Sequence, residues 1–118
     1  MGNKVLVVDD QGFMRKMLGA MLGKHGYEVV GETDNGTEAL ELCKSLSPDI
    51  ITLDNILPDM IGLDLVQELK EHMDNLPRII MISAVNKQEV IDEGVGLGVS
   101  KYLIKPFTED QLVDALNS

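Results

Sequence analysis

The sequence predicts an α/β protein, with an open parallel β-sheet covered by helices on both faces. Short apolar runs recur along the chain, and segments of helical periodicity separate them. The apolar runs are continuous rather than alternating, which is typical of strands buried on both faces. Regular alternation of strands and helices is typical of a parallel sheet. The chain has 118 residues, so we expect one domain over residues 1–118.

Five segments have the character of strands, and the first, third and fourth are the richest in β-branched or aliphatic residues. In chain order these segments are residues 5–8, 28–30, 50–53, 79–82 and 102–104. Five βα units in a domain of this size favour a flavodoxin-like three-layer sandwich with strand order 2-1-3-4-5. In that order a functional crevice is expected at the carboxyl ends of the strands, near the first and third.

Helical periodicity appears after each strand. The first helix is marked by Met14, Met17, Leu18, Met21 and Leu22, and the later helices by apolar residues within 39–46, 65–73, 90–95 and 112–116. Thr108 and Gln111 have the spacing of a capping box at the start of the last helix. Gly94, Gly96 and Gly98 crowd the fourth helix, and an interior glycine costs about 1 kcal/mol relative to alanine. We therefore expect a short or mobile helix there.

Composition excludes several classes of function. The chain has 20 acidic and 10 basic residues, a formal charge of −10. This charge disfavours nucleic acid and anionic membranes as partners and favours metal cations or basic protein surfaces. Cys43 is the one cysteine, so it has no partner for an internal disulfide, and no apolar run is long enough to span a membrane. We expect a cytoplasmic protein.

Polar side chains stand at the ends of four predicted strands. Asp9 and Asp10 follow the first strand, Asp54 the third, Ser83 the fourth and Lys105 the fifth. Each alone has a structural explanation, such as a helix cap, a turn or a solvated lysine. Because parallel strands bring their carboxyl ends to one edge, the coincidence across four strands favours a shared site.

This set of groups indicates phosphoryl chemistry. Three clustered carboxylates repel one another, and a hard divalent cation such as Mg²⁺, or alternatively Mn²⁺, would neutralise them. A cation with few protein ligands keeps positions open for phosphate oxygens, while a lysine and a hydroxyl bind the remaining oxygens. Phosphoryl transfer requires mainly positioning and charge neutralisation. The sequence therefore predicts a site that holds a phosphoryl group on a carboxylate.

With these motifs the chain resembles the receiver domain of two-component response regulators, particularly the single-domain chemotaxis type. The resemblance covers essentially the whole chain. It is carried by VLVVDD at 5–10, LDNILPDMIG at 53–62, Ser83-Ala84 and Lys105-Pro106-Phe107. Because four separate motifs match jointly, the resemblance is specific.

The resemblance implies a role for each site residue. Asp54 would be the phosphoacceptor. Asp10 would bind Mg²⁺ directly, Asp9 would support it mainly through water, and the main-chain carbonyl of Ile56 would complete the protein ligands. Ser83 would donate a hydrogen bond to the phosphoryl group, and Lys105 would form a salt bridge with it.

The resemblance also implies a switch and a means of tuning it. Ser83 would move toward the phosphoryl group, and Tyr102 would rotate into the space behind it. Ile56 and Val85 occupy the positions that tune dephosphorylation by lining the path of the attacking water. Both are apolar here, which predicts a long-lived phosphoryl group.

The implied function is a signalling switch that catalyses only its own phosphorylation and dephosphorylation. A sensor histidine kinase would supply the phosphoryl group. The fourth helix, fifth strand and fifth helix would contact a downstream protein, such as a motor switch or a relay protein. The chain would be a monomer or a phosphorylation-promoted dimer.

Other functions stay open. The chain could be a phosphorelay intermediate, a receiver piece of a longer transcriptional regulator, or a degenerate receiver used only for binding. A hydrolase acting through an aspartyl-phosphate is disfavoured because Asn55 and Ile56 supply no second acid after Asp54.

Overall fold

A computed structural model describes residues 2–118. Within that range the strands are β1 (Lys4–Val8), β2 (Glu28–Thr33), β3 (Ile50–Leu53), β4 (Arg78–Ser83) and β5 (Lys101–Ile104). The helices that alternate with them are α1 (Gly12–Lys24), α2 (Gly36–Leu46), α3 (Gly62–His72), α4 (Gln88–Leu97) and α5 (Glu109–Asn117). Each strand predicted from an apolar run is present.

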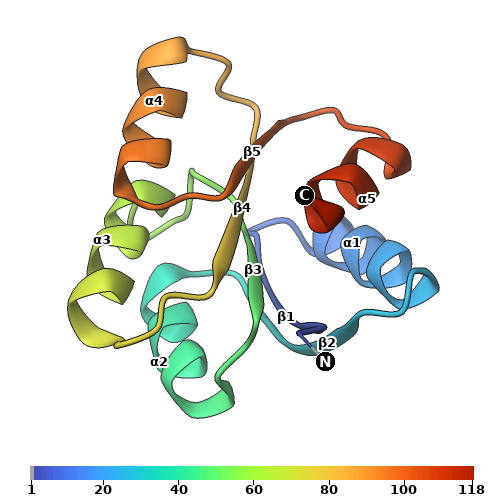
Figure 1. Ribbon diagram of the computed structural model, residues 1–118, viewed down its shortest axis with the longest axis horizontal. Coiled ribbons are helices and arrows are strands. Elements are labelled where there is room, and N and C mark those ends of the chain that lie inside the picture. The colour runs from blue at the N-terminus through green and yellow to red at the C-terminus, as the bar shows by residue number, and fades with distance from the viewer. Residues whose placement is uncertain (1) are drawn as a thin grey trace.

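The strands form one parallel sheet in the order β2-β1-β3-β4-β5, so the predicted flavodoxin-like fold is confirmed. Figure 1 shows α2, α3 and α4 on one face of the sheet and α1 and α5 on the other. The order changes direction between β1 and β3. The loops that follow these two strands therefore flank the crevice at the carboxyl edge.

Each face of the sheet has its own buried core. Leu6 and Val8 point to the core under α2, α3 and α4, which also contains Cys43. Val5 and Val7 point to the core under α1 and α5. Two buried faces explain why the central strands are continuous apolar runs.

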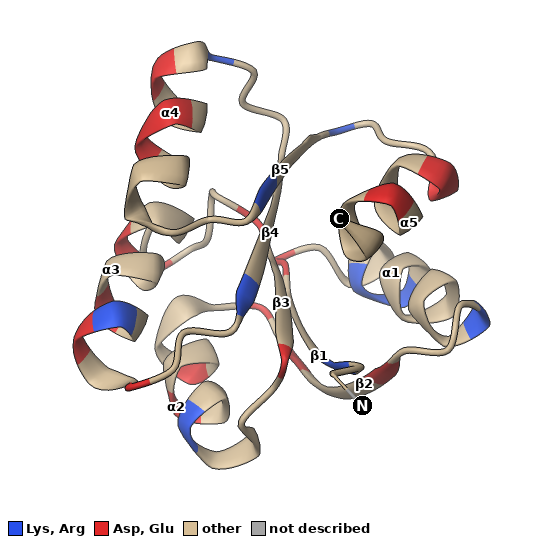
Figure 2. Ribbon diagram, viewed as in Figure 1, with Lys and Arg blue, Asp and Glu red and all other residues tan. Residues whose placement is uncertain are grey.

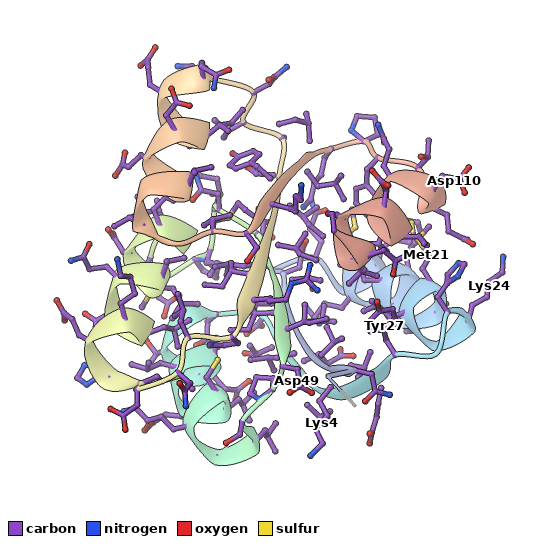
Figure 3. The ribbon with its side chains drawn as sticks, viewed as in Figure 1. Lys4, Met21, Lys24, Tyr27, Asp49 and Asp110 are labelled. Carbon is purple, nitrogen blue, oxygen red and sulfur yellow. The ribbon has the colours of Figure 1, made fainter. Side chains whose placement is uncertain are left out.

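The methionine stripe of α1 serves packing. Met14 and Met21 lie against the core beneath α1 and α5. Figure 3 shows Met21 in the space between these two helices. On the other face, burial raises the pKa of Cys43 to about 12, so its thiol is protonated at neutral pH.

The fourth helix, expected to be short or mobile, runs for 10 residues, against 11 each for α2 and α3 and 9 for α5. Gly94 is buried, and a Cβ there would be 3.4 Å from Leu63 on α3. Gly98 follows the helix and caps it with φ of 113°. Gly98 thus has a positive role in the cap, whereas a Cβ at Gly94 would make only ordinary van der Waals contacts.

Both ends of α5 are fixed by side chains. Thr108 and Gln111 form the predicted capping box at the start of α5. The guanidinium of Arg78 donates to the carbonyls of Ala115, Leu116 and Ser118, at the other end of that helix.

No helix within residues 2–118 has the length and apolarity needed to cross a membrane.

The amino edge of the sheet is held by contacts between Lys4 and Asp49, and the Asp49 amide donates to the Lys4 carbonyl at 2.9 Å. The Asp49 carboxylate accepts a hydrogen bond from the Lys4 amide at 3.0 Å, and Figure 3 shows both residues at this edge. The predicted chemical groups lie at the opposite, carboxyl edge.

Candidate functional site

The carboxyl edge of the sheet carries a small open cavity of about 250 Å³. Its lining comes from the loops after β1, β3, β4 and β5 and consists of Asp10, Gln11, Asp54, Ile56, Ser83, Ala84, Val85 and Lys105. Asp9 lies beneath it and is 1 % exposed. The structure therefore brings together the strand-end residues that the sequence singled out. Figure 2 shows acidic segments at the ends of the central strands.

A larger cavity of about 640 Å³ lies at the amino edge, far from these groups. It is lined by charged residues of both signs, including Lys44, Asp49 and Asp74. Its arginine, Arg78, is already bonded to the carbonyls at the end of α5. His72 of this lining belongs to a surface cluster with Glu68 and Glu71 on α3. The strand-end residues that the sequence singled out gather at the smaller cavity, which is therefore the candidate site.

Lys105 connects two carboxylates across the sheet edge. Its Nζ lies 3.0 Å from Oδ2 of Asp9 and 3.4 Å from Oδ2 of Asp54. Burial alone lowers the pKa of Lys105, but the bond to Asp9 and the charge of Asp54 outweigh this effect. The pKa of Lys105 therefore lies above its ordinary value, and the ammonium is retained.

Asp9 is oriented by main-chain groups of its own loop. Its Oδ1 accepts the amide proton of Gln11 at 2.9 Å. Arg15 donates from its guanidinium to the Asp9 carbonyl at 2.8 Å and also pairs with Glu32 on β2 at 3.1 Å. The first turn of α1 therefore fixes the backbone of the acidic loop.

Asp54 is held in a position that disfavours its charge. Burial raises its pKa above the ordinary value, the charge of Lys105 opposes this effect, and the charge of Asp9 adds to it. Its Oδ1 accepts a weak hydrogen bond of 3.3 Å from the Ile56 amide. Lys105 and this bond therefore compensate the negative charge of Asp54 only in part, and a bound cation would compensate it further.

The donor set fits a hard divalent cation. Carboxylate oxygens of Asp9, Asp10 and Asp54 lie within 4.8 Å of one another. Asp9 and Asp54 are buried, whereas Asp10 is exposed at the cavity. Oxygen ligands on one side with an open cavity on the other suit Mg²⁺, which keeps several water ligands.

Ser83 and Tyr102 are linked through one residue. The Ser83 hydroxyl accepts the Val85 amide proton at 3.1 Å, and the Tyr102 hydroxyl donates to the Val85 carbonyl at 2.9 Å. Ser83 is buried, and Tyr102 is half-buried outside the cavity lining. The peptide groups of Val85 thus join the predicted switch residues.

The raised pKa of Asp54 predicts that Asp54→Asn stabilises the metal-free protein. At a pH between the ordinary and the raised pKa of Asp54, the carboxyl group is protonated in the folded protein and ionised in the unfolded chain. The free energy of unfolding therefore falls as pH rises through this interval. At pH 7 in EDTA, we expect the variant to gain about 1 kcal/mol in urea unfolding, and we expect the gain to shrink at pH 4.

Asp74→Asn is the matched control, because Asp74 is exposed in the loop before β4. It should leave the free energy of unfolding unchanged. A destabilised Asp54→Asn variant at pH 7 would show that Lys105 fully compensates the buried charge.

Sequence reasoning missed three residues that shape the site. Arg15 supports the Asp9 loop, and Asn55, 5 % exposed, accepts the Leu63 amide proton at 3.2 Å through Oδ1. Asp59 bonds to the start of α2. Asn55 offered a signal because it is a polar residue beside Asp54. The contacts of Asp59 join segments more than 20 residues apart, whereas Arg15 reaches a carbonyl only six residues before it.

The fold and the acidic site define the class of the protein as a two-component receiver domain. The chain belongs to the response regulator receiver domain family, whose model matches residues 5–117. It is 44% identical to the chemotaxis protein CheY of Thermotoga maritima over 117 residues, covering 99% of this chain and 97% of that protein. It is 39% identical to CheY of Bacillus subtilis, with the same coverage.

Solved structures agree with this assignment. The chain superposes on a chain of the CheX-CheY-BeF3-Mg complex from Borrelia burgdorferi with a TM-score of 0.91 and 29% identity. That match covers 96% of this chain and 85% of the other. The resemblance predicted from the motifs is therefore confirmed.

Proposed function

We propose that the chain is a phosphorylation-dependent switch that accepts a phosphoryl group on Asp54, with Mg²⁺, from a sensor histidine kinase. One observation carries the proposal: Lys105 lies between Asp9 and Asp54 at the wall of a cavity that also contains Asp10 and Ser83. Membership of the receiver family supports the same function. We also propose that residues 1–118 form one receiver domain.

The residues divide the work of the transfer. Asp10, Asp54 and the Ile56 carbonyl would hold the cation, with Asp9 supporting it mainly through water. The bound cation supplies charge neutralisation for the transferring group. A carboxylate oxygen of Asp54 bonds to phosphorus as the bond from phosphorus to the donor nitrogen breaks, and the donor keeps that electron pair. Lys105 and Ser83 then bind phosphoryl oxygens.

The output would follow from the contacts of Val85. To donate its proton to a phosphoryl oxygen, the Ser83 hydroxyl would turn toward the cavity and away from the Val85 amide, from which it now accepts at 3.1 Å. Loss of the bond to its amide would free Val85 to move, and the Val85 carbonyl is the group that accepts from the Tyr102 hydroxyl at 2.9 Å. Tyr102 can then change rotamer, which shifts the population of packings on the face formed by α4, β5 and α5.

The pathway is proposed from the relatives. Identity of 44% to a chemotaxis protein supports a chemotaxis role in the cytoplasm, with a motor-switch protein as the target. A phosphorelay intermediate is the alternative, because it would use the same site with a relay protein as the partner. Phosphorylation-promoted dimerisation through the same face fits either role.

Intact-protein mass spectrometry after incubation with acetyl phosphate tests the function. We expect a gain of one phosphoryl group in Mg²⁺ or Mn²⁺ and none in EDTA. Hydroxylamine should remove the group, because it cleaves acyl phosphates. A gain that resists hydroxylamine or ignores the metal would contradict a metal-dependent aspartyl phosphate.

A further inference from the structure

We propose that Asp59 is a positioning residue that sets the geometry of the metal site, by fastening the tip of the β3–α3 loop to the first turn of α2. This inference rests on the proposed function, since it concerns the main-chain ligand of the same cation. Asp59 lies five residues beyond Asp54 and does not line the site cavity.

The loop between β3 and α3 is a small hairpin with Asp59 at its tip. Ile56 and Ile61 form an isolated antiparallel bridge, and the Leu57 amide donates to the Met60 carbonyl at 3.1 Å. Ile56 is 55% exposed and Pro58 is also exposed. Leu57, between them, is 7% exposed and belongs to the core under α2, α3 and α4. Apolar burial therefore anchors the hairpin at Leu57 but not at Ile56 or at the tip.

The base of the same loop is fixed. The Asp54 amide donates to the Val8 carbonyl at 2.9 Å, and the Gly62 amide donates to the Asn55 carbonyl at 2.6 Å. These bonds position Asp54 relative to β1, but they lie below the hairpin. Ile56 stands between this fixed base and the exposed tip.

Asp59 attaches the tip of the hairpin to α2 by polar contacts. Its Oδ1 accepts the Gly36 amide proton at 2.8 Å, and its Oδ2 accepts from the amide and hydroxyl of Thr37 at 2.9 and 2.7 Å. Both amides belong to the first turn of α2, where helix geometry leaves them without partners. Three short bonds to one carboxylate fix the tip in position and orientation.

The carboxylate is well suited to this attachment. The Gly36 amide and the Thr37 hydroxyl lower the pKa of Asp59 to about 2, so the group is ionised across the physiological range. A negative charge at a helix N-terminus is also favoured by the helix dipole. The local cap, Asn35, already accepts the Glu38 amide proton, so Asp59 adds bonds that the helix cannot supply itself.

Packing beside Asp59 reinforces the contact. Met60 lies over Gly36, where an added Cβ would collide with its sulfur. The loop and α2 therefore approach at van der Waals distance as well as through hydrogen bonds. Because Asp59 and Ile56 belong to one hairpin, loss of the bonds to α2 would loosen the Ile56 carbonyl.

The test is Mg²⁺ binding by the unphosphorylated full chain, followed through the amide NMR shifts of Ile56 and Leu57. We expect Asp59→Ala to bind Mg²⁺ about fivefold more weakly than wild type, the equivalent of about 1 kcal/mol. Asp59→Asn keeps an oxygen acceptor, so its affinity for Mg²⁺ should lie between those of wild type and Asp59→Ala. At saturating Mg²⁺, phosphoryl uptake by Asp59→Ala should approach the wild-type level.

Asn35→Ala is the matched control, because it removes a cap from the same helix end without touching the loop. Its affinity for Mg²⁺ should stay within about twofold of wild type while its thermal stability falls like that of Asp59→Ala. Equal weakening in both variants, or wild-type affinity in Asp59→Ala, would overturn the inference. Failure of wild type to bind Mg²⁺ would overturn the proposed function as well.

Discussion

Lys105→Met is expected to lower the free energy of unfolding of the metal-free protein by about 2–3 kcal/mol. The ammonium lies 3.0 Å from Asp9 and 3.4 Å from Asp54, and both carboxylates are buried. Removing it leaves two carboxylates at the same edge without a counter-charge. Urea unfolding in EDTA measures the loss, and added Mg²⁺ should recover more stability in the variant than in wild type.

The same substitution should slow phosphoryl uptake from acetyl phosphate by roughly 10²-fold at saturating Mg²⁺, because a preorganised charge at the transferring group is lost. Lys101→Met is the control, since Lys101 is exposed on β5 and forms no salt bridge among the described residues. Adding Asp54→Asn to Lys105→Met should restore stability. If Lys105→Met behaves like Lys101→Met, the carboxylates are not coupled to the lysine.

Ile56→Asn combined with Val85→Glu is expected to shorten the phosphoryl lifetime at least about tenfold. Both residues line the cavity beside Asp54, and neither apolar side chain can orient an attacking water. An amide and a carboxylate at these positions can bind that water and accept its proton. Decay of the phosphorylated mass after removal of the donor gives the lifetime.

Polar side chains can be accommodated at both positions, because Ile56 is exposed and Val85 is half-buried. Ile56→Leu and Val85→Ile keep the apolar character and should keep the wild-type lifetime. Equal lifetimes for the polar pair and wild type would mean that another feature controls access of water to Asp54.

The fold could be predicted because its determinants are local. Continuous apolar runs mark the strands, and a parallel sheet brings their carboxyl ends together without further information. Asp10, Asp54, Ser83 and Lys105 follow directly from that rule, and Asp9 lies just beneath the same cavity. The capping box at Thr108 was likewise visible as a short sequence pattern.

What could not be predicted depends on contacts between distant segments. Asp59 follows a proline and has the appearance of an ordinary turn residue, yet its carboxylate caps a helix 22 residues earlier at Thr37. Gly94 was interpreted as a weakness of the fourth helix, but it is the position at which α4 is buried, beside Leu63 and Val99. Helix propensity alone contains no information about such neighbours.

The central claim is that Asp54 carries the phosphoryl group. The most direct measurement is peptide-mapped mass spectrometry of wild type and Asp54→Asn after incubation with acetyl phosphate and Mg²⁺. The account predicts one phosphoryl group on the wild-type peptide containing Asp54 and none anywhere in the variant. Wild-type uptake mapped to another residue, or undiminished uptake by Asp54→Asn, would contradict it.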